Sequence, residues 1–198
     1  MTAPADDDGI RKTVRTVALL NLGYFGVEFA VALAIGSVAL FADSVDFLED
    51  ASINILIFIG IGWSAARRAR LGMVLAALLL VPSIATLLTA WQNFSTGLVP
   101  APIPMTLAGL GALAVNFTCA SLLARYRAHG GSLTRAAFLS ARNDVLANIA
   151  IIITGLVTAA TASPWPDLVT GLGIAAMNAD AAREVYEAAR AESAEAKP

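Results

Sequence analysis

The chain has 198 residues, of which 58% are hydrophobic and 14% are charged, with a mean hydropathy of +0.72 and a formal net charge of -2. A soluble domain carries roughly 25% charged residues, so this composition excludes an ordinary soluble protein and indicates an integral membrane protein. With one cysteine, Cys119, and one histidine, His129, the chain has neither an intramolecular disulfide nor a metal site built from histidine alone.

Six apolar segments follow a short acidic N-terminus. Residues 1–13 contain the acidic run Asp6–Asp8 and are predicted to be a disordered cytoplasmic tail. The apolar segments, each close to the ~20 residues that cross a bilayer as a helix, cover about residues 14–35, 38–65, 71–91, 105–124, 136–161 and 165–186. The sequence therefore predicts an all-α, polytopic membrane protein with six transmembrane helices in one domain, residues 14–187, and a short cytoplasmic tail, residues 188–198.

The basic residues agree with this number of crossings. Of the thirteen Lys and Arg residues, all but one lie before the first segment, in the second or fourth link, or near the C-terminus. The other three links contain none, and because Lys and Arg gather on the cytoplasmic side, both termini are predicted to be cytoplasmic. The exception is Arg142, inside the fifth segment. Its long side chain either reaches the cytoplasmic interface or pairs with Glu28 or Glu49.

Four acidic residues interrupt the second segment: Asp43, Asp46, Glu49 and Asp50. A carboxylate near the bilayer centre costs at least ~2.5 kcal/mol, so it normally faces a bundle interior or a water-filled cavity and marks an ion or proton pathway. A helix turns by ~100° per residue, so one narrow face carries Asp43, Asp46, Asp50 and Asn54. Glu49 lies to one side of this face. The second segment is therefore predicted to carry one polar stripe.

Two segments carry polar residues four positions apart, a spacing that places both side chains on one helix face. The second segment has Asp46 and Asp50, and the fifth has Ser140 and Asp144, followed by Asn148. If the two faces meet, three carboxylates and a hydroxyl surround one point. Such an oxygen-rich site suits Mg, Ca or Mn, whereas zinc usually also recruits His or Cys. Three carboxylates exceed the charge of a divalent ion by one, so the empty site is expected to bind protons, and exchange of metal for protons follows.

The neighbouring polar residues have structural interpretations as well as functional ones. Asp43 either supports the site or caps and solvates the outer end of its helix, and Glu49 is a second supporting candidate. Asn148 is a third, although the favoured role of both Asn54 and Asn148 is a hydrogen bond between helices. A serine in a membrane helix usually bonds the carbonyl four residues earlier or a neighbouring helix, so metal ligation by Ser140 is one of two alternatives.

The segment Gly36–Asp50, with the sequence GSVALFADSVDFLED, resembles the second-helix signature of the cation diffusion facilitator (cation efflux) family. In that family a small-residue turn leads into an Ala-Asp pair and then a His/Asp-x-x-x-Asp motif. Asp46 and Asp50 match the metal-binding pair of this motif. The resemblance continues in the fifth segment, where Asp144 matches the aspartate of the second half of the family's site and Ser140 falls where a His or Asp usually stands.

The resemblance extends over nearly the whole chain. Asn21 and Glu28 in the first segment and the run Pro166–Leu168 at the start of the sixth also fit the family. It implies a six-helix transporter, not an enzyme and without a cofactor, that exports a divalent metal ion in exchange for protons. Such transporters are commonly homodimers.

Two departures from the family pattern affect these expectations. Asp46 and Ser140 stand where histidine is usual, and an Asp pair on the second helix is more typical of members that handle manganese or iron than zinc. Family members typically continue into a cytosolic domain, whereas residues 188–198 follow the sixth segment here, so we expect a short form made of the membrane domain alone.

The leading hypothesis is a multi-pass metal/proton antiporter of the cell (inner or plasma) membrane that acts in efflux. The expected partners are a divalent metal ion, protons, the lipid bilayer and a second copy of the chain, and no nucleic acid. The predicted metal ligands are Asp46, Asp50, Ser140 and Asp144. One alternative is a membrane scaffold that has lost transport. Another is a metal-dependent membrane enzyme of the phosphatidyltransferase kind, whose motif begins like Asp43-x-x-Asp46 but then requires a glycine where the chain has Phe47.

Overall fold

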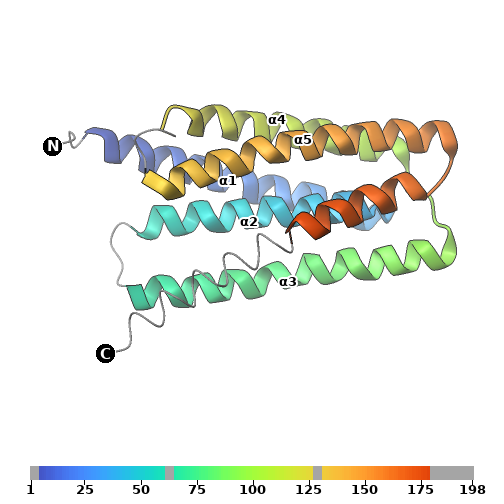
Figure 1. The fold of residues 1–198 in the computed structure, drawn as a ribbon, viewed down its shortest axis with the longest axis horizontal. Helices are drawn as coiled ribbons and strands as arrows, with labels where there is room; N and C mark the ends of the chain where they lie inside the picture. The colour runs from blue at the N-terminus through green and yellow to red at the C-terminus, as the bar shows by residue number, and fades with distance from the viewer. Residues whose placement is uncertain (1–4, 61–64, 127–130, 179–198) are drawn as a thin grey trace.

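The computed structural model describes residues 5–60, 65–126 and 131–178, and its regular elements within these ranges are all helices. They are α1 (Ala5–Ile35), α2 (Val38–Gly60), α3 (Ala65–Thr96), α4 (Pro102–Ala124) and α5 (Gly131–Thr161), followed by a helix over residues 165–178. The labelled helices lie side by side along one long axis and form an elongated bundle (Figure 1). The prediction of an all-α protein is confirmed.

Three helical segments are long and apolar enough to cross a membrane: Asp8–Ile35, Pro102–Ala124 and Ser140–Thr161. A span needs ~20 mainly apolar residues, so these helices and the composition together make the chain an integral membrane protein. The six crossings and the cytoplasmic position of both termini stay predictions. The predicted C-terminal tail, residues 188–198, lies outside the described ranges.

The first helix begins earlier than its apolar segment, because α1 starts at Ala5. The prediction of a disordered tail is therefore wrong from residue 5 onward. This part of α1 has partners in the bundle: Ile10 packs against the buried cluster that includes Val14 and Ile57, and the Arg11 guanidinium lies 5.6 Å from the centroid of the Phe58 ring. Packing against α2 thus extends the helix beyond its apolar segment.

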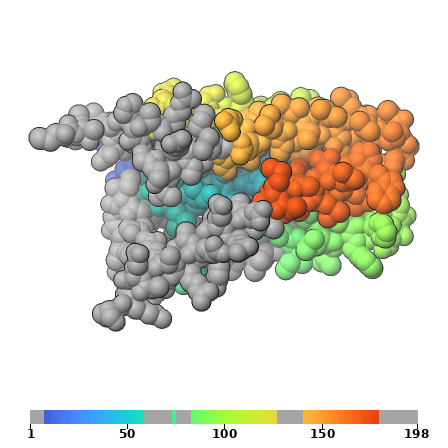
Figure 2. Space-filling model, viewed as in Figure 1, coloured from blue at the N-terminus to red at the C-terminus, as the bar shows by residue number. Residues whose placement is uncertain are grey.

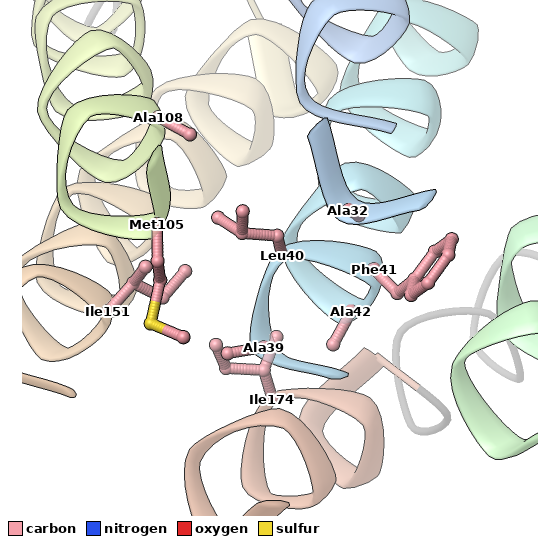
Figure 3. Packing of buried hydrophobic residues seen from close by; sticks show 9 residues of the cluster. All are labelled: Ala32, Ala39, Leu40, Phe41, Ala42, Met105, Ala108, Ile151 and Ile174. Carbon is pink, nitrogen blue, oxygen red and sulfur yellow. The ribbon is translucent and has the colours of Figure 1, made fainter. Parts of the chain in front are cut away.

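The main apolar core lies where α1, α2, α4, α5 and the 165–178 helix meet (Figure 3). Leu40 of α2 lies at its centre, between Met105 of α4 and Ala32 of α1, and Phe41 extends to the other side of α2. Ile151 of α5 and Ile174 of the last helix belong to the same cluster. The remaining members are small, namely Ala39, Ala42 and Ala108. Small residues let helices approach closely in membrane proteins, so this core holds α2 in the middle of the bundle.

The first turn of α2 is capped by a residue of the 165–178 helix. The Oδ1 atom of Asp167 accepts a hydrogen bond from Ser37 Oγ at 2.7 Å and one from the Ala39 N–H at 3.1 Å, and its Oδ2 atom accepts one from the Val38 N–H at 2.7 Å. The first N–H groups of a helix have no acceptor within the helix, so Asp167 acts as a cap donated by another helix.

The 165–178 helix lies at the surface between α3 and α5 (Figure 2). Its Trp165 ring packs edge-on against Phe94 of α3 at a centroid distance of 6.1 Å, and the hydroxyls of Thr170 and of Thr154 on α5 are 2.7 Å apart. Together with the Asp167 cap, these contacts fix the N-terminal end of α2 and hence the position of its acidic residues along the bundle.

Candidate cation site

The polar stripe of α2 faces the interior of the bundle, as its helical phase predicts. Asp43, Asp50 and Asn54 are buried, with exposed fractions of 0%, 3% and 1%, and Asp46 is half-buried. Glu49, which the phase places to one side, is also buried. The reason is that α2 packs against α1, α3 and α5, so it is enclosed on more than the one side that carries the stripe.

The polar faces of α2 and α5 meet at Asp50. The hydroxyl of Ser140 donates a hydrogen bond to Asp50 Oδ1 at 2.9 Å, and the carboxyl group of Asp144 lies beside that of Asp50. Three of the four predicted ligands therefore come together from two helices that are about 90 residues apart in the sequence. Ser140 bonds a neighbouring helix here, which is one of the two roles its type predicts.

Asp46, the fourth predicted ligand, lies one helical turn from Asp50 towards the N-terminal end of α2. Its carboxyl group interacts electrostatically with Asp144 and with the other acids of α2. Within residues 5–60, 65–126 and 131–178, however, no three Asp, Glu, His or Cys side chains are grouped as a metal site. Ligation of one ion by Asp46, Asp50 and Asp144 together therefore requires these carboxyl groups to draw closer, and the ligand set stays a prediction.

A second polar group lies further towards the N-terminal end of α2, around Asp43. The Nδ2 atom of Asn148 on α5 donates to Asp43 Oδ2 at 2.7 Å, and Asn116 Nδ2 on α4 donates to Asn148 Oδ1 at 3.0 Å. The carboxyl group of Glu28 on α1 lies beside that of Asp43. The prediction that Asn148 bonds between helices is confirmed, and Asp43 is a buried partner of this network and not a cap exposed to solvent.

Two other expectations do not hold. Asn54 donates from Nδ2 to the Asp50 carbonyl of its own helix at 2.8 Å, so the predicted bond between helices is wrong. It lies one turn from Asp50, where the backbone of α2 itself offers the nearest acceptor. Arg142 is exposed and donates to its neighbour Asn143. In the described part of the chain Arg142 makes no ion pair with Glu28 or Glu49, so the prediction of an ion pair is wrong. Its exposed position agrees with the other prediction, that its side chain reaches the membrane interface.

Sequence reasoning missed Asn116. Its side chain is 2% exposed and holds Asn148 in place. The signal was available, because Asn116 is the one amide side chain within the otherwise apolar segment Met105–Ala124. An isolated amide in a membrane helix usually bonds another helix.

Among the side chains that the structure describes, the buried acids have no basic partner. Arg11, Lys12, Arg15, Arg125 and Arg142 are all exposed, and none of them pairs with an acid of α2. Several carboxylates in a low-dielectric interior are costly unless compensated by charge. The arrangement therefore favours cations taken up from solution, either protons or metal ions.

The match to a known family covers this whole arrangement. A family model described as the cation efflux transmembrane domain matches residues 14–190. The matched range contains Glu28, the acids of α2, and the polar residues of α4 and α5. No curated protein matches the chain.

Proposed function

The chain belongs to the cation efflux family and is a membrane cation transporter, and from that premise we propose that it exchanges a divalent metal ion for protons. The observation that carries the proposal is the junction of α2 and α5, where Ser140, Asp50 and Asp144 meet inside the bundle. Buried acids without basic partners are the usual mark of an ion or proton pathway.

The charge of the site supports a divalent cargo. With Asp46 drawn in, three carboxylates face one ion, and a divalent ion leaves a net charge of only minus one. Without the ion, protons can neutralise the neighbouring carboxyl groups. The adjacent Asp50 and Asp144 carboxyl groups form a favourable contact only when one of them carries a proton, because two carboxylates cannot donate to each other. Metal binding therefore displaces protons.

The donor set favours a hard metal ion. Every predicted ligand offers oxygen, and oxygen ligands suit Mn, Mg or Ca, whereas zinc sites usually contain His or Cys. We propose Mn or Fe as the leading cargo, exported from the cytoplasm by a chain embedded in the inner or plasma membrane as a homodimer. These assignments rest on the family resemblance and on the ligand chemistry.

The test is metal flux in proteoliposomes, run with Mn, Fe, Co, Zn, Cd and Mg while proton movement is followed with a trapped pH dye. Flux of one or a few metals with opposite proton movement is expected for the native chain. Asp50→Asn and Asp144→Asn should reduce it to the background of empty vesicles. Asp8→Asn is the control, because Asp8 is exposed near the start of α1.

Two results would contradict the proposal in different ways. Equal flux in the native chain and in both variants would place the cargo path elsewhere. Absence of flux for every metal, with metal binding retained in detergent, would favour the scaffold or enzyme alternatives. The scaffold alternative is included because no three of the described acids are grouped as a metal site.

A further inference from the structure

Glu28 is a fully buried acid on α1 with no donor to neutralise it. Its exposed fraction is 0%, and among the described residues neither Oε1 nor Oε2 receives a hydrogen bond from an N–H or O–H group. Tyr24, one turn earlier on α1, is not available, because its hydroxyl donates to the Ala108 carbonyl at 2.6 Å. An isolated buried carboxylate is too costly to be left in this state.

Glu28 lies beside another acid. Asp43 is also 0% exposed, and its carboxyl group and that of Glu28 are within hydrogen-bonding distance of each other. Asn148 occupies Asp43 Oδ2, and Asp43 Oδ1 has no donor in the described part of the chain. Ionised carboxylates only accept hydrogen bonds, so the contact is favourable only when one of the two groups carries a proton.

We propose that Glu28 and Asp43 hold one proton between them and form a proton-binding site separate from the Ser140–Asp50–Asp144 junction. Asp43 precedes Asp50 by seven residues, which is ~10 Å along the helix axis. The two carboxyl pairs thus occupy different levels of the bundle, and the Glu28–Asp43 pair lies nearer the N-terminal end of α2.

The network around the pair positions it for this role. Asn116 holds Asn148, and Asn148 holds Asp43, so one oxygen of Asp43 is fixed and the other is left for Glu28. The titratable groups that face the pair are Tyr24 from α1, Asp46 from α2 and Asp144 from α5. The described side chains of α4 and α3 present no charged group to it. Among the described side chains, the charged neighbours of the pair are therefore all acidic.

The consequence for transport rests on the proposed metal/proton exchange. A divalent ion held by Asp46, Asp50 and Asp144 places two positive charges roughly 4.5 to 10 Å from the pair along the axis of α2, in an interior where charges interact more strongly than in water. This repulsion favours release of the shared proton and leaves two carboxylates. The pair therefore adds one proton to those displaced directly from the metal ligands.

The first measurement is infrared spectroscopy of the metal-free protein in detergent at neutral pH, in the C=O stretching region of protonated carboxylic acids. Glu28→Gln should lower this band by the intensity of one group. Asp43→Asn should do the same, and Asp8→Asn should leave the band unchanged. Glu28→Gln is expected to fold, since its amide donates to Asp43 in place of the proton. Asp43→Asn gives an independent answer if Glu28→Gln is unstable.

The second measurement counts protons released per Mn²⁺ bound, by calorimetry in buffers of different ionisation enthalpy. Glu28→Gln should bind Mn²⁺ within about threefold of the native affinity and release one proton fewer, whereas Asp8→Asn should match the native count.

A full native infrared band in both Glu28→Gln and Asp43→Asn would overturn the proposal. So would two Mn²⁺ ions per native chain and one per Glu28→Gln chain, because the pair would then be a metal site. The infrared result does not depend on transport, so loss of the band without any metal flux would support the proton pair and refute the antiporter.

Discussion

Ser140 on α5 donates a 2.9 Å hydrogen bond to Asp50 on α2, and this contact marks where the polar faces of the two helices meet. Asp144 joins the same point through its carboxyl group. A donor in this position fixes the orientation of the Asp50 carboxyl group whether or not Ser140 itself contacts the cargo. Four predictions concern this contact and the polar and packing contacts near it.

Replacing Ser140 with alanine should weaken metal binding. Asp50 loses the donor that orients it, and removal of a group that orients a metal ligand typically costs 10- to 100-fold in affinity. We expect the Mn²⁺ dissociation constant to rise by about tenfold in calorimetric titrations. Ser121→Ala is the control, because its hydroxyl is exposed and donates to the Phe117 carbonyl of its own helix. Equal affinities in Ser140→Ala and the native chain would contradict the prediction.

Replacing Ser140 with histidine should shift metal preference towards zinc. The substitution places an imidazole beside Asp50 and Asp144, and a mixed nitrogen and oxygen donor set suits zinc better than oxygen alone. The measurement is the ratio of Zn²⁺ to Mn²⁺ flux in proteoliposomes, which should rise by tenfold or more, on the order of 1.4 kcal/mol in relative affinity. A ratio that stays at the native value would show that position 140 does not reach the metal.

Replacing Asn148 with leucine should destabilise the bundle. The change removes the donor of Asp43 and the acceptor of Asn116, and each buried polar group left without a partner costs about 1–3 kcal/mol. We expect the midpoint of thermal unfolding in detergent to fall. Asn143→Leu is matched in chemistry and helix but is exposed and bonds only Arg142, so its midpoint should change little. Similar losses in both variants would contradict the network.

Replacing Gly171 with alanine should also destabilise the bundle, for a steric reason. A Cβ atom at Gly171 would lie 2.5 Å from the Val38 carbonyl carbon and 2.6 Å from the Ala39 nitrogen. These are backbone atoms in the first turn of α2, so they cannot move without disturbing the Asp167 cap. Gly173→Ala, two residues on, has nothing within 4 Å of the new Cβ and should be neutral or stabilising by up to ~1 kcal/mol. Thermal unfolding distinguishes the two, and equal midpoints would refute the close contact.

Local periodicity was enough to predict the polar stripe of α2 and the face shared by Ser140 and Asp144. Side-chain direction repeats every 3.6 residues on any helix, so a spacing of four places two residues together wherever the helix lies. The same reasoning predicted that buried acids in an apolar segment face a bundle interior. The structure agrees for Asp43 and Asp50, and the junction with α5 agrees for Ser140 and Asp144.

Periodicity says nothing about how far one helix slides or rotates against another, and the partners of the buried polar groups depend on that. Asn148 is 105 residues from Asp43 in the sequence, and it bonds Asp43, one level nearer the N-terminal end of α2 than the Asp50–Asp144 junction. Glu28 meets Asp43, not Arg142, because the packing of α1 against α2 sets their relative depth. Asn54 has the same phase as Asp50 and yet bonds only its own helix. The types and faces of these residues were therefore local properties of the chain, whereas their pairing was decided by the packing of small residues in the core, which sets the depth of each helix.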